Sequence, residues 1–145
     1  MSKLSLAAFR TGAWISIVTA FVHLAGHVAG PQAPKNETEA KLTELMTTYA
    51  LELPGAPRRT MMELFDGFSL LFSLTLALTG ILALAIARSR GVVPELYRFT
   101  AIALAGSYGI LLGISLKHFF LAPTVCLGLA FLAFAVSLVP SRDGG

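Results

Sequence analysis

The sequence has few charged residues and only one cysteine, and both shortages restrict what the chain can be. Charged residues make up 13% of its 145 residues, whereas soluble domains usually contain roughly 25%. The single cysteine, Cys126, excludes an internal disulfide and any site built from several cysteines. No basic surface interleaved with aromatic residues is present, so nothing indicates nucleic-acid binding. The composition therefore favours an integral membrane protein whose main partner is the lipid bilayer.

Four long apolar stretches dominate the chain. They cover about residues 8–30, 61–87, 96–116 and 119–139. Each stretch reaches the roughly 20 residues that a helix needs to cross the hydrocarbon core, where an unpaired strand could not satisfy its backbone. We therefore predict one domain, residues 1–145, that is an all-α membrane protein built as a four-transmembrane-helix bundle. Two histidines near the end of the first stretch favour an uncleaved signal anchor over a cleaved secretory signal.

The connection between the first two stretches predicts a helix outside the membrane. Asn36 followed by Glu39 resembles a capping box, and Pro54 with Gly55 marks a stop. The apolar residues between them recur at helical spacing: Leu42, Leu45, Met46, Tyr49 and Leu53. We expect an amphipathic helix over about residues 37–52. It lies in the membrane interface, covers the bundle from outside, or serves only as a connector.

The basic residues give a weak indication of orientation. With both termini inside, the inner side holds Lys3, Arg10, Arg88, Arg90, Arg98 and Arg142. The outer side then holds Lys35, Lys41, Arg58, Arg59 and Lys117. The inner charges lie close to the apolar stretches, and the short connection around residues 88–98 is strongly basic. This pattern favours a cytoplasmic N-terminus and C-terminus, with the long connection outside.

Small residues in the third stretch indicate a face for close helix packing. They recur every four residues: Ala101, Ala105, Gly109 and Gly113. We interpret this ladder as packing within one chain, but the same pattern also suits a homo-oligomer or another membrane partner. Tyr108 falls in the middle of the stretch and therefore needs a hydrogen-bond partner.

The ionisable residues inside the apolar stretches gather toward the outer side under this topology. Such groups are costly at membrane depth and are functional candidates by default. His23 and His27 are four residues apart and share one helix face, while Asp66 lies one turn inside the second stretch. Two histidines and a carboxylate suit a divalent metal ion. We predict these three residues as metal ligands, with Glu63 and His118 as weaker candidates.

Each candidate also has a structural interpretation. The segment from His23 to His27 lacks the glutamate of the zinc-protease helix motif, so protease chemistry is not indicated. Its histidines can instead bond to backbone carbonyls or hydroxyl groups. Thr60 and Glu63 match a capping box, which assigns Glu63 to the start of a helix. Asp66 can pair with a histidine or with Arg59.

Three segments carry a resemblance to a known family: His23-Leu24-Ala25-Gly26-His27-Val28-Ala29-Gly30-Pro31, Arg59-Thr60 and Phe65-Asp66-Gly67-Phe68-Ser69. In these segments the chain resembles a family of small bacterial four-span membrane proteins whose function is uncharacterised. The resemblance covers the first two stretches and their connection, and loosely the remainder. It implies a location in the bacterial cytoplasmic membrane, but it implies no activity, cofactor or catalytic residue.

Three functions stay open at this point. The first is a polar pocket near the outer leaflet that binds a metal ion or a small amphipathic ligand. The second is a structural or accessory membrane subunit whose polar cluster only fixes helix packing. The third is haem binding, which would need axial histidines from different helices, such as His118 with His23 or His27. No local nucleophile motif identifies an enzymatic reaction, and no polar pathway continues to the inner side to indicate transport.

Overall fold

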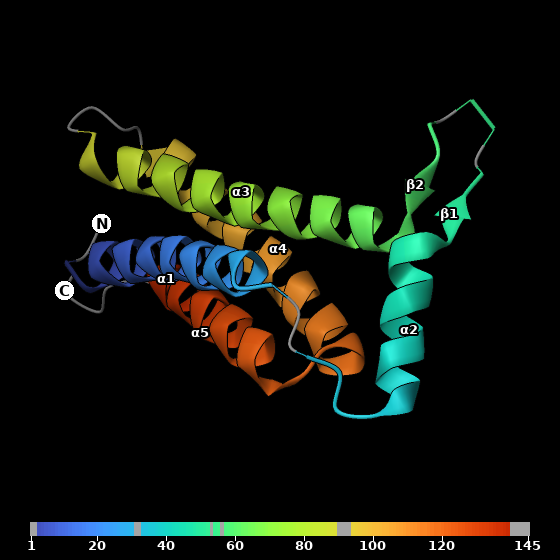
Figure 1. Cartoon of the computed structure of the whole chain (residues 1–145). Coiled ribbons are helices and arrows are strands. Elements are labelled where there is room, and N and C mark those ends of the chain that lie inside the picture. The colour runs from blue at the N-terminus through green and yellow to red at the C-terminus, as the bar shows by residue number, and fades with distance from the viewer. Residues whose placement is uncertain (1–2, 31–32, 53, 56, 90–93, 140–145) are drawn as a thin grey trace, which may run out of the picture.

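The structure, a computed structural model, describes residues 3–30, 33–52, 54–55, 57–89 and 94–139. Within these ranges the elements are α1 Lys3–Val28, α2 Glu37–Thr48, β1 Ala50–Leu51, β2 Arg59–Thr60, α3 Met61–Arg88, α4 Pro94–His118 and α5 Leu121–Ser137. Helices α1, α3, α4 and α5 form a bundle, and α2 lies across one end of it (Figure 1). Several residues used in the sequence predictions fall outside the described ranges: Pro31, Leu53, Arg90 and Arg142.

Three of these helices are long and apolar enough to cross a membrane. They are α1, α3 and α4, with mean hydropathies of 1.4, 2.4 and 1.8 over their most apolar windows. Helix α5 is also apolar but has only 17 residues, a length of about 26 Å at a rise of about 1.5 Å per residue. The prediction of an all-helical chain with membrane-spanning candidates is therefore confirmed for α1, α3 and α4.

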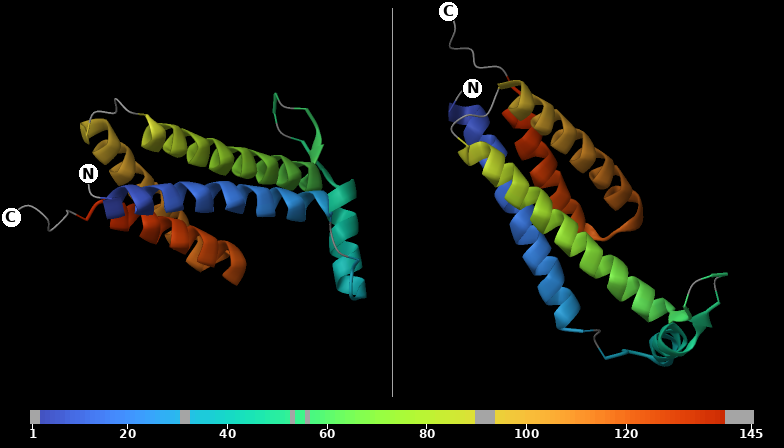
Figure 2. Two further views of the ribbon diagram at one scale, coloured as in Figure 1. Left: turned by 90° about the vertical axis from the view of Figure 1, so that its left-hand side faces the viewer. Right: turned by 90° about the horizontal axis from the view of Figure 1, so that it is seen from above.

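Helix α1 is the central element of the bundle. It packs between α3 and α5, and α4 packs against α5 (Figure 2). Glycines allow the closest approaches. A Cβ atom added to Gly80 of α3 would lie 2.6 Å from the backbone oxygen of Ala13, and one added to Gly12 of α1 would lie 2.9 Å from the ring of Phe134. Small residues therefore let α1 contact both neighbours at short range, as expected for helices that pack in lipid.

The apolar core lies in the half of the bundle that is remote from α2. Its aromatic centre is formed by Phe9, Tyr97, Tyr108 and Phe134, all buried. The ring centroids of Phe9 lie 4.8 Å from Tyr97 and 5.5 Å from Phe134, in tilted and edge-on arrangements that aromatic pairs prefer. Helix α1 begins and α5 ends at this same end of the molecule (Figure 1). The opposite end holds α2 and the candidate residues.

The small-residue ladder of α4 faces the interior over most of its length. Ala101 and Ala105 are buried, and a Cβ on Gly109 would lie 3.3 Å from the ring of Phe131 in α5. Gly113 is exposed and has nothing within 4 Å of such an atom. The ladder thus serves packing within the chain at three of its four positions, and association with a second chain stays a prediction.

Helix α2, in the connection between the first two apolar stretches, begins where the capping pattern predicts. The side chain of Asn36 accepts a hydrogen bond from the backbone N–H of Glu39 at 2.9 Å, and the Glu39 carboxylate accepts one from the backbone N–H of Lys35 at 2.7 Å. These bonds satisfy donors that a helix start otherwise leaves unpaired. The N-terminal boundary of the predicted amphipathic helix is confirmed.

Its C-terminal boundary differs from the prediction. The helix ends at Thr48, and the backbone of Tyr49 is extended, so residues 49–52 are not helical. The chain then forms a two-residue strand pair in which Ala50 faces Thr60 and Leu51 faces Arg59, while Gly55 adopts a positive φ of 75° between the strands. The apolar spacing continues past residue 48, but pairing with the segment before α3 determines the backbone there.

Candidate functional site

The start of α3 is fixed by a complete capping box. Thr60 accepts a hydrogen bond from the backbone N–H of Glu63 at 3.2 Å, and the Glu63 carboxylate accepts one from the backbone N–H of Thr60 at 2.7 Å. The second carboxylate oxygen of Glu63 lies 3.7 Å from Nη1 of Arg59. The structural interpretation of Glu63 is confirmed, and Arg59 pairs with Glu63 rather than with Asp66.

His23 of α1 contacts α3 through a hydroxyl group. Its Nδ1 lies 2.9 Å from Oγ of Ser73, and that hydroxyl is 3.0 Å from the backbone oxygen of Ser69. A hydroxyl has one hydrogen. When it donates to the Ser69 carbonyl, the Nδ1–H of His23 donates to Ser73, and Nε2 is the unprotonated nitrogen of the neutral ring. The ring also meets Phe72 edge-on, with centroids 5.1 Å apart.

His27 and Asp66 lie one turn closer to the α2 end. Nδ1 of His27 is 3.8 Å from Oδ1 of Asp66, which is too long for a hydrogen bond. The contact becomes an ion pair when the imidazole is protonated. The side chains are 21% and 45% exposed, respectively, so the pair is open on one side. The structure thus brings together two of the three residues predicted as metal ligands.

The complete metal site is not assembled in this geometry. Over the described ranges, no group of three or more histidine, cysteine, aspartate or glutamate side chains is placed to hold a metal ion. Zinc sites in proteins use at least three protein ligands, whereas only His27 and Asp66 of the three predicted ligands are in contact here. Metal binding by these three residues stays a prediction.

His118 stands apart from the two histidines of α1. It is exposed in the last turn of α4. The polar contacts described for His23 and His27 are made with α3. The predicted haem, held between His118 and a histidine of α1, therefore receives no support from these contacts.

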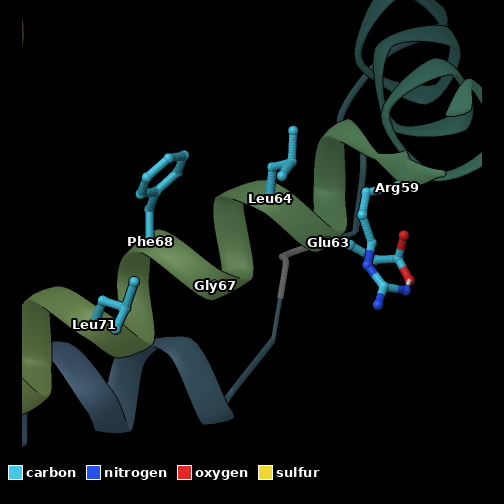
Figure 3. A pocket seen from close by; sticks show the side chains of 6 residues that line it. All are labelled: Arg59, Glu63, Leu64, Gly67, Phe68 and Leu71. Atoms are coloured by element: carbon cyan, nitrogen blue, oxygen red, sulfur yellow. Dashed lines mark ion pairs between the residues drawn. The ribbon is translucent and has the colours of Figure 1, made fainter. Parts of the chain in front are cut away.

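An open groove of about 400 Å³ lies on α3 next to this cluster (Figure 3). It is lined by Arg59, Glu63, Leu64, Gly67, Phe68 and Leu71. The two charged residues occupy one end, at the start of α3, and the remaining lining residues are apolar or glycine. A Cβ on Gly67 would meet nothing within 4 Å, so the groove is open above this residue.

Sequence reasoning missed this groove, although a signal for it exists. Glu63, Gly67 and Leu71 are each four residues apart and so follow one stripe along the start of α3, and Arg59 precedes them at the same spacing in β2. The predictions concentrated on Asp66, which belongs to the neighbouring face that meets α1. The polar cluster and the groove are therefore adjacent but distinct parts of the same end of the molecule.

Two further polar contacts were only partly foreseen. Tyr108 has the hydrogen-bond partner that its mid-span position requires, because its hydroxyl donates to Oγ of Ser16 at 2.5 Å. Tyr97, for which no hydrogen-bond partner was predicted, is buried and donates to the backbone oxygen of Ser5 at 3.0 Å. In the part of the chain that the structure describes, every buried side-chain nitrogen or oxygen has a hydrogen-bond partner.

Comparisons with protein-family models, with curated proteins and with solved structures found no match to this chain. The resemblance to small bacterial four-span proteins therefore stays a prediction based on its three short segments. The fold alone would not define a function even with a match. A function for this chain is therefore inferred from the geometry at the α2 end of the bundle.

Proposed function

We propose that this chain is a four-span protein of the bacterial cytoplasmic membrane that binds a small amphipathic ligand in the α3 groove. The observation that carries the proposal is the separation of polar and apolar lining along the groove. Arg59 and Glu63 lie at the start of α3, whereas Gly67, Phe68 and Leu71 lie one to two turns further along the helix. A ligand with a polar head and an apolar body fits this order.

Flanking residues support α5 as the fourth span. Phe119 and Phe120 precede the helix and are exposed, and Leu138 with Val139 follows it. These residues lengthen the apolar segment to about the 20 residues that a span requires. Aromatic residues at the turn between α4 and α5 also suit a membrane interface. An even number of spans places both termini on the same side of the membrane, as the predicted cytoplasmic N-terminus and C-terminus require.

The charges at the groove favour a zwitterionic head group. The guanidinium of Arg59 and the carboxylate of Glu63 are paired at 3.7 Å, and both side chains are about half exposed. An anionic group of the ligand would approach Arg59, and a cationic group would approach Glu63. The volume is within the usual range for small-molecule sites, roughly 300–1,000 Å³. Because the groove is open, a ligand drawn from the bilayer would keep part of its body in lipid.

A glycine substitution tests this function with little effect on packing. The Gly67→Phe variant places a ring in the open space of the groove, where a Cβ meets no atom within 4 Å. Gly113→Phe is the matched control, since it adds the same ring at another open helical glycine on α4. We expect native mass spectrometry of the purified protein to show a retained amphiphile that Gly67→Phe loses and Gly113→Phe keeps. Equal retention in both variants would refute the groove as the site.

A structural or accessory role is the second candidate, and the cluster between α1 and α3 favours it. His23 is bonded to Ser73, and His27 is next to Asp66, so the polar groups of the two helices contact each other. Such contacts between helices in lipid typically contribute about 0.6 kcal/mol each. On this account, His23→Ala lowers thermal stability and leaves the retained amphiphile unchanged. An amphiphile lost from His23→Ala at unchanged stability would contradict the structural role.

A further inference from the structure

Helix α2 presents an apolar face that nothing in the described chain covers. No residue of α2 is buried. Leu42 and Leu45 of α2 and Tyr49, the C-cap residue that follows the helix, recur at helical spacing and are 57%, 61% and 61% exposed. Three large side chains exposed on one face are unusual for a helix that faces only water, because contiguous exposed apolar surface generally marks an interaction site.

The helix is held in a fixed position despite this exposure. Its start is capped by Asn36, and its end leads into the strand pair that joins it to the start of α3. It contacts both β2 and α3. In Figures 1 and 2, α2 runs across the axis of α3 at the end where α3 begins.

The apolar surface of α3 continues to the position of α2. Met61, Phe65 and Phe68, in the first two turns of α3, are all exposed, and these turns belong to a helix that is long and apolar enough to cross a membrane. A helix that crosses the end of such a span lies at the depth of the lipid head groups. This is the usual place of amphipathic interfacial helices.

We propose that the apolar face formed by Leu42 and Leu45 of α2, together with Tyr49 directly after the helix, inserts into the lipid interface of the membrane that the bundle spans. Tyr49 suits this depth because its ring is apolar and its hydroxyl is polar. The helix carries three glutamates and one lysine, so attraction to anionic lipids does not drive the insertion. The insertion is driven by burial of the apolar face in the lipid interface. The proposal rests on the membrane location proposed above and is independent of a ligand in the groove.

Tryptophan fluorescence in nanodiscs tests the insertion. The native Trp14 is first replaced by phenylalanine, and a single tryptophan is then introduced by Leu45→Trp. Ala40→Trp is the control, because Ala40 is exposed on the opposite side of α2. The bilayers contain zwitterionic phosphatidylcholine, with bromine atoms near either the carbonyl end or the methyl end of the acyl chains.

For Leu45→Trp we expect blue-shifted emission and a loss of intensity that is larger with bromine near the carbonyl end. The Ala40→Trp emission should be quenched by aqueous iodide and should be insensitive to bromine. The proposal is overturned when Leu45→Trp responds to iodide as strongly as Ala40→Trp does and ignores the bromolipids. That result would indicate that this face of α2 is exposed to water and is available to a protein partner. Amphiphile retention in the Gly67→Phe variant is measured separately, so failure of the groove and failure of α2 insertion are distinguishable.

Discussion

Replacing Gly80 by alanine tests the contact between α1 and α3, because this contact leaves no room for a methyl group. A Cβ on Gly80 would lie 2.6 Å from the backbone oxygen of Ala13, 2.6 Å from Cγ1 of Ile17 and 3.2 Å from the backbone nitrogen of Ile17. The side chain of Ile17 can rotate away. The carbonyl of Ala13 cannot move unless the backbone of α1 shifts.

Two effects of opposite sign determine how much Gly80→Ala changes the free energy of unfolding. Alanine favours a helix over glycine by about 0.8–1.0 kcal/mol. Inserting a methyl group into a packed contact costs about 1–3 kcal/mol, and contact with backbone atoms places this case in the upper part of that range. The expected net result is a loss of on the order of 1–2 kcal/mol in the free energy of unfolding.

The measurement is the loss of helical circular dichroism as sodium dodecyl sulfate is added to the protein in bicelles. Gly113→Ala is the matched control, since a Cβ at that position meets nothing within 4 Å. The control should unfold at the same detergent fraction as the wild type or later, and Gly80→Ala should unfold earlier. A Gly80→Ala protein as stable as the control would refute the close approach of α1 and α3.

The remaining predictions concern individual polar residues. Tyr108→Phe removes the hydrogen bond to Ser16 and should lower the free energy of unfolding by about 1 kcal/mol. A double-mutant cycle with Ser16→Ala should then give a coupling of about 0.6 kcal/mol, and zero coupling would show that the bond is not formed. If His23, His27 and Asp66 do bind a divalent metal ion, elemental analysis should find metal in the wild type and none in the His23→Ala/His27→Ala double variant. Equal, negligible metal in both proteins would exclude the site.

The sequence predicted the parts of the fold that local physics controls. The capping residues Asn36 and Thr60 mark the starts of α2 and α3, because each supplies an oxygen to a backbone N–H group nearby in the chain. Hydrophobic length identified α1, α3 and α4 as candidate spans, because the thickness of the bilayer sets a minimum for an apolar helix. These signals need no knowledge of distant contacts.

Features that depend on distant partners were missed or only half predicted. The strand pair between residues 50–51 and 59–60 is too short to have a pattern of its own and exists only because the two segments meet. The hydrogen bond of buried Tyr97 is made to Ser5, which is 92 residues away in the sequence. His23 was predicted as a ligand together with His27 and Asp66, but its Nδ1 lies 2.9 Å from Oγ of Ser73, a contact that depends on how α1 packs against α3.

The most direct test of the central claim is photocrosslinking from the groove in native membranes. A benzophenone amino acid placed at Gly67 should form an adduct whose added mass is that of an amphiphile. The same amino acid at Gly113, which is also an open glycine, gives the background labelling by bulk lipid. The proposed function predicts one defined adduct at Gly67 above that background. A Gly67 adduct pattern identical to that at Gly113 would contradict it.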